Sequence, residues 1–219
     1  MISIPDELIN TLSLSPGPKL NRGKYGKHVT FIHSRKNGGI IACESLLEAD
    51  FCLELERSHA ITAYTSQPFT LHLLNSRQQY TPDFAARLQN KNLVIYEIKM
   101  DSALSDTLTR ERLNLYKTLI AQCGYALECI GNSQFGHPIR TRNLHLLYHK
   151  SFGADRRSAS NILSLIQNSP RQKLNVQELL NNQASPQDIA YAVFYGLAST
   201  DLQRPFSLHS QLQCRGTHV

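Results

Sequence analysis

Long apolar runs and paired cysteines are what this sequence of 219 residues lacks. No stretch approaches the roughly 18 consecutive apolar residues that a membrane-spanning helix requires. The N-terminus, MISIPDELINTLS, has no basic start followed by an apolar block and so differs from a secretion signal. We therefore expect a protein of the cytosol that has no membrane partner.

Cysteine and histidine are present but carry no recognisable motif. The five cysteines are odd in number and include no CxxC pair. This spacing argues against both a disulfide framework and a zinc cluster, and we expect small, mostly buried residues instead. The nine histidines are equally scattered. A lone histidine such as His59 is more often a structural residue than a metal ligand.

The positive charge is concentrated at the N-terminal end of the chain, whose net charge is +6. Residues 1–40 carry six basic and two acidic residues, whereas residues 41–129 carry eight basic and eleven acidic ones. Because the first segment is also rich in glycine and proline, we expect a basic arm that is only partly ordered until it binds a polyanion. Nucleic-acid phosphates are the commonest such partner, and a solubilising tail is the alternative. The candidate DNA contacts of this arm are Lys19, Arg22, Lys24, Lys27, Arg35 and Lys36.

Residues 41–150 have the pattern of a domain that mixes helices and strands. The segment ESLLEADFCLELERSH, which starts at Glu44, has apolar residues at helical spacing. Strand-like segments follow at residues 61–64 and 69–74, and the segments YTPDFAARL and LVIYEIK then predict a hairpin.

A second helix is predicted after this hairpin. Ser105 is its expected N-cap, and its apolar stripe consists of Leu108, Leu115 and Leu119. The strand YALECIG follows the helix. The order helix, antiparallel strands, helix and strand indicates an α/β (α+β) fold.

The texture changes beyond Lys150. Three short helices are predicted in ASNILSLIQNS, NVQELLNNQ and SPQDIAYAVFYGLAST, with N-caps at Asn175 and Ser185 for the last two. The tail RPFSLHSQLQCRG is a candidate two-stranded wing. The chain is thus expected to contain an arm (1–40), a central domain (41–150) and a small winged-helix-like domain (151–219), a class that usually binds DNA or protein.

The strand LVIYEIK carries two charges on one face. Alternate side chains of a strand share a face, so Glu97 and Lys99 project together. If the hairpin closes through a three-residue loop at residues 89–91, Asp83 falls opposite Glu97. Opposed side chains have Cβ atoms roughly 4.5–5.5 Å apart, and two carboxylates at that separation repel each other unless a proton or cation lies between them. The hard cations Mg²⁺ and Mn²⁺ suit such oxygen ligands.

A third acid comes from the first predicted helix. Glu48 shares the apolar stripe of Phe51 and Leu55, so it should point towards the sheet. For Glu48 taken alone, a solvated or salt-bridged residue is the alternative.

Pro82-Asp83 and Glu97-Ile98-Lys99 together resemble the PD-(D/E)XK nuclease pattern. The ordered set ESLLEADFCLELE, SQPFTL, QYTPDF and YEIK is similar to the TnsA family, the endonuclease subunit of heteromeric bacterial transposases, over about residues 20–150. This resemblance implies a restriction-endonuclease-like core, in which a mixed sheet is flanked by helices. The C-terminal winged-helix-like domain also fits the family.

The resemblance implies roles for individual residues. Glu48, Asp83 and Glu97 are the implied metal ligands, together with the Ile98 backbone carbonyl, and Lys99 is the implied catalytic lysine. Mg²⁺ is the implied cofactor, and Mn²⁺ is its implied substitute. Gln67, Tyr80 and Thr81 also match the family's text; Gln67 is a candidate for the surrounding shell, and Tyr80 suits a core or a functional role equally.

The resemblance also implies an activity and partners. The expected enzyme is a Mg²⁺-dependent DNA endonuclease of the bacterial cytosol that cuts the 5′ (non-transferred) strand at the ends of a transposon. Its expected partners are double-stranded transposon-end DNA, a DDE-type transposase subunit (TnsB-like) and an AAA+ ATPase regulator (TnsC-like), the last through the C-terminal domain. The alternatives are a stand-alone restriction-type or junction-resolving nuclease, and a catalytically silent DNA-binding or scaffold module.

Overall fold

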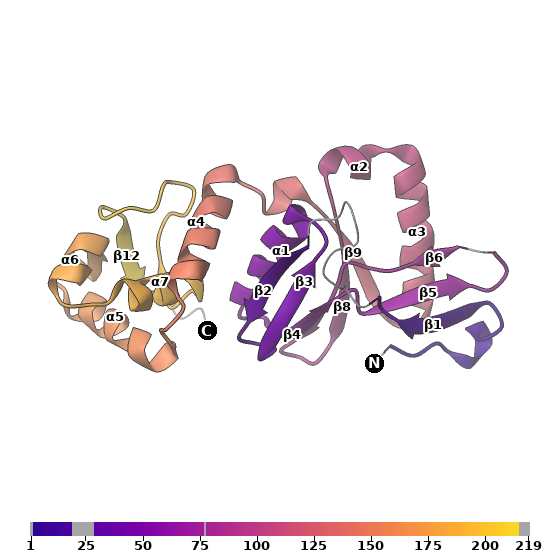
Figure 1. The fold of residues 1–219 in the computed structure, drawn as a ribbon, viewed down its shortest axis with the longest axis horizontal. Coiled ribbons are helices and arrows are strands. Elements are labelled where there is room, and N and C mark those ends of the chain that lie inside the picture. The colour runs from indigo at the N-terminus through magenta and orange to yellow at the C-terminus, as the bar shows by residue number, and fades with distance from the viewer. Residues whose placement is uncertain (1, 19–28, 77, 215–219) are drawn as a thin grey trace. The chain divides into compact units, whose positions relative to one another are not determined.

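The computed structural model describes residues 2–18, 29–76 and 78–214, and the chain divides into two compact units, Met1–Phe135 and Gly136–Val219 (Figure 1). The second unit begins at Gly136, whereas the sequence predicted a boundary after residue 150. The helix α4 (Pro138–Lys150) belongs to the second unit because its buried side chains Leu144, Leu147 and Tyr148 contribute to that unit's core. Tyr148 packs against Phe194, with ring centroids 5.6 Å apart.

The main sheet of the first unit is mixed. Its four strands follow the order β4-β7-β8-β9, with β7 antiparallel to both β4 and β8 and with β9 parallel to β8. The strands are β4 (Ile61–Ser66), β7 (Phe84–Leu88), β8 (Leu93–Lys99) and β9 (Ala126–Gly131). The expected mixture of helices with parallel and antiparallel strands is therefore confirmed, and β8 is an inner strand.

The β7–β8 hairpin has the predicted register. Phe84 pairs with Tyr96, and the Leu88 N–H donates to the Asn92 carbonyl at 2.9 Å, which closes a loop of residues 89–91. Lys91 takes a left-handed conformation, with φ of 68°, at the end of this loop. The same register extended by one residue places Asp83 across from Glu97.

Two smaller sheets complete the first unit. One has the order β1-β5-β6, and the other pairs β2 with β3. Their strands are β1 (Leu12–Pro16), β5 (Phe69–Leu73), β6 (Gln79–Tyr80), β2 (Thr30–Ser34) and β3 (Gly39–Cys43). The short 3₁₀ helices η1 (Asp6–Leu8) and η2 (Asn132–Gln134) lie outside these sheets.

Two sequence-based expectations are corrected here. YTPDFAARL does not form one strand, because β6 pairs with β5 in a different sheet while Asp83 lies in a bend before β7. Pro82 has no N–H to donate to a ladder, which is consistent with the break. The second concerns the N-terminal arm, which was expected to be only partly ordered: in its described residues β1 pairs with β5 and β2 pairs with β3, while residues 19–28 lie outside the described ranges.

Helices α1 (Leu46–Arg57) and α3 (Thr107–Gln122) lie on opposite sides of the main sheet (Figure 1). On the α1 side, the Phe51 ring lies 5.3 Å from the ring of Tyr96 and 5.9 Å from that of Phe84. On the α3 side, Ile95 of β8 belongs to a buried cluster with residues of α3 and of the β1-β5-β6 sheet.

The predicted start of the second helix is wrong, and of its predicted stripe only Leu119, which is partly buried, packs against the core. Ser105 ends the short helix α2 (Asp101–Ser105), and Asp106 caps α3 by accepting a hydrogen bond from the Thr109 N–H at 2.8 Å. Leu108 is 77% exposed and Leu115 41% exposed. The buried face of α3 instead consists of Leu113, Tyr116 and Ile120. Both sets have helical spacing, and only the contact with the sheet distinguishes them.

In its described residues, 136–214, the second unit contains four helices and a small sheet of order β10-β12-β11. Besides α4 these elements are α5 (Arg156–Asn168), β10 (Lys173–Asn175), α6 (Val176–Asn181), α7 (Pro186–Phe194), β11 (Ala198–Ser199) and β12 (Gln211–Cys214). The predicted caps are confirmed: Asn175 accepts from the Glu178 N–H at 2.8 Å, and Ser185 from the Asp188 N–H at 3.0 Å.

The described part of the tail contributes one strand, β12, which pairs with β10 and β11, rather than the two expected strands. None of the helices in the described ranges is long and apolar enough to cross a membrane. Cys43 and Cys52 are buried, whereas the other three cysteines are half-buried, and all five are free.

Candidate functional site

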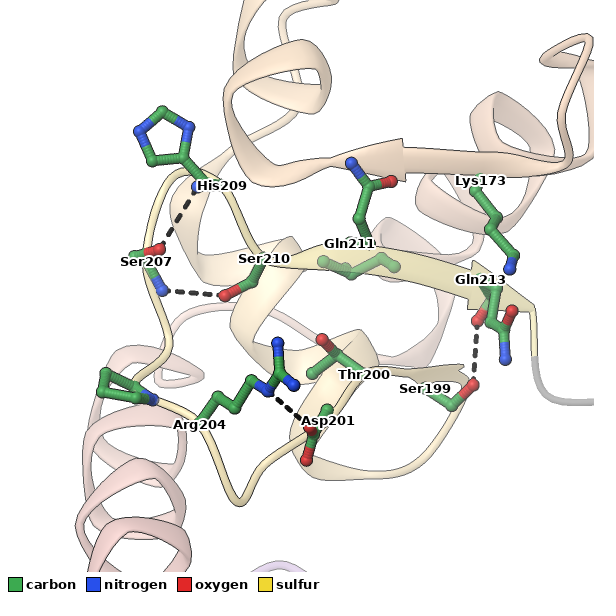
Figure 2. Close-up of a pocket in the computed structure, with 12 residues that line it drawn as sticks. Lys173, Ser199, Thr200, Asp201, Arg204, Ser207, His209, Ser210, Gln211 and Gln213 are labelled. Atoms are coloured by element: carbon green, nitrogen blue, oxygen red, sulfur yellow. Dashed lines mark hydrogen bonds and ion pairs between the residues drawn. The ribbon is translucent and has the colours of Figure 1, made fainter.

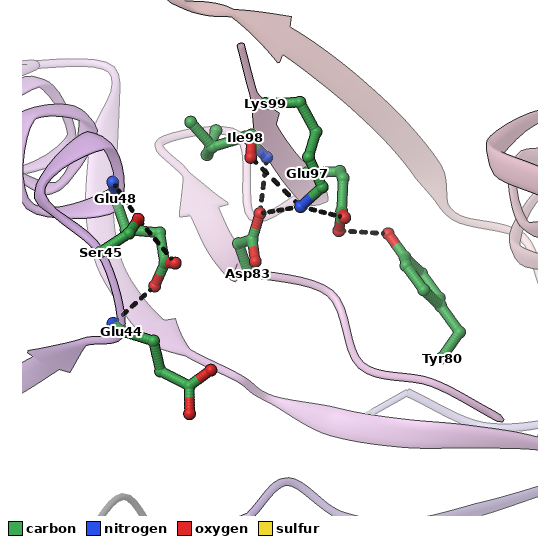
Figure 3. A network of polar contacts seen from close by, with 8 residues as sticks. All are labelled: Glu44, Ser45, Glu48, Tyr80, Asp83, Glu97, Ile98 and Lys99. Carbon is green, nitrogen blue, oxygen red and sulfur yellow. Dashed lines mark hydrogen bonds and ion pairs between the residues drawn. The ribbon is translucent and has the colours of Figure 1, made fainter. Parts of the chain in front are cut away.

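The ammonium group of Lys99 lies among three oxygen atoms of the predicted ligand set (Figure 3). Its Nζ is 2.7 Å from Glu97 Oε1, 3.5 Å from Asp83 Oδ2 and 3.3 Å from the Ile98 carbonyl oxygen. The fold thus brings together four groups that the sequence analysis selected: Asp83, Glu97, the Ile98 carbonyl and Lys99.

The backbone of β8 holds the Asp83 carboxylate in place. Asp83 lies in the bend that precedes β7, and its Oδ2 accepts a hydrogen bond from the Ile98 N–H at 2.7 Å. The β7–β8 ladder ends at the Phe84–Tyr96 pair, so the Ile98 N–H lies beyond the last paired residues of β7. The Asp83 side chain accepts this N–H in place of a strand carbonyl. The break in the predicted strand therefore positions the acid.

Tyr80 holds the other oxygen of Glu97. Its hydroxyl donates to Glu97 Oε2 at 2.7 Å, and both side chains are buried. The Tyr80 ring stacks on Tyr116 of α3, with ring centroids 4.2 Å apart. Burial, with the adjacent Glu97 carboxylate, raises the pKa of Tyr80, so the hydroxyl keeps its proton and acts as the donor. The sequence alone left Tyr80 open between a core and a functional role, and this contact shows that it touches the site.

The charges of the site are unequal. Burial and the Glu97 carboxylate raise the pKa of Asp83 to about 7, against the opposing effects of Lys99 and the Ile98 N–H. Burial would lower the pKa of Lys99, but Asp83 and Glu97 outweigh it and raise that pKa, so the ammonium stays charged. Two carboxylates facing one ammonium leave one negative charge to be balanced. A proton balances it near neutral pH, and the oxygen donors also suit a hard divalent cation.

Glu48 does not join this cluster. Its side chain points inward from α1 and is 9% exposed, as the sequence predicted. However, its Oε2 accepts from the Glu44 N–H at 2.8 Å and its Oε1 from the Ser45 hydroxyl at 2.9 Å, while Ser45 Oγ accepts from the Glu48 N–H at 3.1 Å. These contacts form the N-terminal cap of α1, in which Ser45 and Glu48 hold each other.

The position of α1 explains why Glu48 lies apart. Helix α1 packs through Phe51 on the face of β8 that carries Tyr96, whereas Glu97 and Lys99 belong to the alternate face. Figure 3 shows the Glu48 carboxylate turned towards Glu44 and Ser45. In the described ranges, no group of three or more His, Cys, Asp and Glu side chains is placed to hold a metal ion.

Gln67 supports the site through its main chain. Its N–H donates to the Asp83 carbonyl at 2.9 Å, and its φ is 43°. Gly17 lies directly against this backbone, because a Cβ atom at Gly17 would come within 1.6 Å of the Gln67 carbonyl oxygen. The side-chain Oε1 of Gln67 is buried and has no hydrogen-bond partner among the described residues. The backbone of residue 67, rather than its amide side chain, therefore positions Asp83.

Of the predicted DNA contacts, only Arg35 and Lys36 lie within the described residues, whereas Lys19, Arg22, Lys24 and Lys27 lie outside them. The Lys36 ammonium donates to the Leu55 carbonyl at 2.7 Å and to the Ser58 carbonyl. These carbonyls belong to the C-terminal end of α1, so Lys36 has a structural role that competes with phosphate binding. Burial lowers the pKa of Lys36 to about 8, although Glu56 opposes this shift.

A buried carboxylate that the sequence analysis overlooked lies under this end of α1. Glu56 is fully buried and accepts hydrogen bonds from Ser34 Oγ at 2.7 Å, Tyr64 Oη at 2.9 Å and the Arg35 N–H at 3.0 Å. Its place on the buried stripe of the helix was the available signal. Glu56 ties β2 and β4 to α1 and takes no part in the Lys99 cluster.

The second unit has a polar pocket of about 510 Å³ beside β12 (Figure 2). Arg204 pairs with Asp201 at 3.3 Å, and the Ser199 hydroxyl donates to the Gln213 carbonyl at 3.4 Å. Asp201 is the one acidic residue among those that line it. This pocket therefore has no pair of carboxylates.

Comparison of the sequence with known protein families found no match, and comparison with curated proteins found none either. The functional assignment therefore depends on the residues and on their geometry.

Proposed function

We propose that this protein is a metal-dependent DNA endonuclease, the TnsA-like subunit of a heteromeric transposase. The observation that carries the proposal is the convergence of Asp83 Oδ2, Glu97 Oε1 and the Ile98 carbonyl on the single cation of Lys99. Three oxygen donors, one from the bend before β7 and two from β8, surround a lysine, and these are residue types that phosphodiester hydrolysis requires.

The site residues have two proposed roles, metal binding by the oxygen donors and charge stabilisation by Lys99. Asp83, Glu97 and the Ile98 carbonyl would hold Mg²⁺, which supplies charge neutralisation at the scissile phosphate and a water of lowered pKa. Asp83 would bind the ion in its deprotonated form, and its proton would go to solvent. The Lys99 ammonium would then donate to phosphate oxygens instead, where it would stabilise the developing negative charge and orient the attacking water. Glu48, which is held in the cap of α1, would act on the site only through its negative charge, which adds to burial and Glu97 in raising the pKa of Asp83.

The elements of each unit, taken separately, support the transposase context. The first unit is proposed to be the restriction-endonuclease-like core, in which Asp83 of the bend before β7 and Glu97 of β8 meet at the Lys99 ammonium. The second unit is proposed to be a winged-helix domain, because its elements follow the order α5, β10, α6, α7, β11 and β12. This unit would contact the AAA+ ATPase regulator, and the DDE-type transposase would cut the 3′ ends.

Reconstitution tests the proposal. The chain is mixed with a candidate DDE-type transposase, transposon-end DNA and Mg²⁺, and 5′-strand nicks are mapped on a sequencing gel. We expect nicks at the transposon ends only when both proteins are present, and none with an Asp83→Ala variant that still folds. Cleavage by this chain alone would favour a stand-alone nuclease. DNA binding without cleavage in any mixture would favour a silent DNA-binding module.

A further inference from the structure

The two carboxylate oxygens of Glu97 have separate partners. Oε1 faces the Lys99 ammonium at 2.7 Å, together with Asp83 and the Ile98 carbonyl. Oε2 faces away from that cluster and accepts the Tyr80 hydroxyl at 2.7 Å (Figure 3). Only Oε1 of Glu97 is therefore directed towards the position that the Lys99 ammonium occupies, which is the position proposed for the metal ion.

Packing fixes the position of the Tyr80 hydroxyl. Tyr80 pairs with Leu71 in the β5–β6 ladder, so its backbone belongs to a different sheet from that of Glu97. Its ring is 7% exposed and lies nearly parallel to that of Tyr116, with an interplanar angle of 13°. Moving the hydroxyl away from Glu97 would break this stack.

Divalent cations differ in the number and geometry of the carboxylate oxygens that they bind. Mg²⁺ requires near-octahedral geometry with short bonds, whereas Ca²⁺ accepts six to eight oxygens and often takes both oxygens of one carboxylate. A carboxylate whose second oxygen is already occupied by a fixed donor suits the first ion better than the second. Removing a residue that hydrogen-bonds to a metal ligand typically changes metal affinity by about 10- to 100-fold.

We propose that Tyr80 is a positioning residue that restricts Glu97 to ligation through Oε1 and so makes the site select Mg²⁺ and Mn²⁺ over Ca²⁺. This inference rests on the proposed function, because it requires Glu97 to be a metal ligand.

The test compares two buried tyrosines that touch each other. Tyr80→Phe removes the hydroxyl that contacts Glu97, while Tyr116→Phe removes one that reaches only the Gln79 carbonyl, at 3.3 Å. Both changes keep the stacked rings. Binding of Mg²⁺ and of Ca²⁺ to the full chain is measured by calorimetry without DNA. We expect the ratio of Ca²⁺ to Mg²⁺ affinity to rise about tenfold in Tyr80→Phe and to stay unchanged in Tyr116→Phe.

The outcomes separate this inference from the proposed function. If the wild-type chain binds Mg²⁺ but Tyr80→Phe keeps the same affinity ratio, or loses both ions equally, Tyr80 does not set selectivity while the metal site stands. If the wild-type chain and its complex with DNA bind neither ion, the proposed function fails as well. Should Tyr80→Phe not fold, infrared carboxylate bands of the wild-type chain, assigned with Glu97→Gln, decide the question: two-oxygen ligation of Mg²⁺ by Glu97 would overturn the inference, and one-oxygen ligation would support it.

Discussion

Glu97 and Lys99, two positions apart on β8, form an ion pair in which Oε1 and Nζ are 2.7 Å apart. Alternate residues of a strand share a face, so this contact follows from the local backbone. Asp83 reaches the same ammonium from the bend before β7, at 3.5 Å. In the proposed site the two acids bind the metal ion and Lys99 does not, so substitutions of the acids and of the lysine should affect metal binding differently.

Replacement of Lys99 should separate cleavage from metal binding. We expect Lys99→Ala to lower the rate of 5′-strand nicking by about 100-fold or more, because one charged donor to the developing charge is lost. Mg²⁺ binding should persist, since Asp83, Glu97 and the Ile98 carbonyl remain. Lys117→Ala, which changes an exposed lysine of α3, is the control. Nicking at the wild-type rate in the reconstituted complex would exclude Lys99 from catalysis.

The lowered pKa of Lys36 predicts that the free energy of unfolding depends on pH in the alkaline range. Its pKa is about 8 in the folded chain and 10.5 in the reference state, so between these values the unfolded chain binds more protons than the folded one. The free energy of unfolding contributed by this group therefore rises as pH increases from about 8 to 10.5. Urea unfolding of wild type and Lys36→Met across this window measures it. The rise should be absent from the variant, and parallel pH profiles would contradict the prediction.

Glu56 and Glu54 offer a matched pair on α1. Glu56→Ala removes the acceptor of three hydrogen bonds and leaves buried donors behind, so we expect a loss of about 3 kcal/mol or more in unfolding free energy. Glu54 pairs with Arg57 at 3.6 Å near the surface, and Glu54→Ala should cost about 0.5 kcal/mol. Urea denaturation measures both. Equal losses would mean that the buried network contributes little.

Gly17 should affect cleavage although it lies far from Asp83 in sequence. A methyl group at Gly17 would overlap the Gln67 carbonyl, and Gln67 in turn holds the Asp83 backbone. We expect Gly17→Ala to lower stability by about 1–3 kcal/mol and to reduce nicking by shifting the Asp83 bend. Gly39→Ala has space for its methyl group and is the control. Unchanged stability and nicking in Gly17→Ala would show that this contact does not matter.

Local features of the sequence determined the strand, the hairpin and the cation cluster. The alternation of β8 and the three-residue loop fix which residues face one another, because strand period and turn length act over a few neighbouring residues. Asp83, Glu97 and Lys99 were found in this way, whereas the Ile98 carbonyl was implied by the family resemblance, and the structure brings all four groups together.

Only the tertiary structure decided the contacts between elements. The sequence allowed either of two apolar stripes on α3, and packing against the sheet buried Leu113, Tyr116 and Ile120 rather than Leu108 and Leu115. It could not show that Glu48 caps its own helix, or that Tyr80 crosses from a second sheet to Glu97. Helical spacing reports which side chains share a face, but the partner of that face is set by elements distant in the chain, whose positions depend on the packing of the whole core.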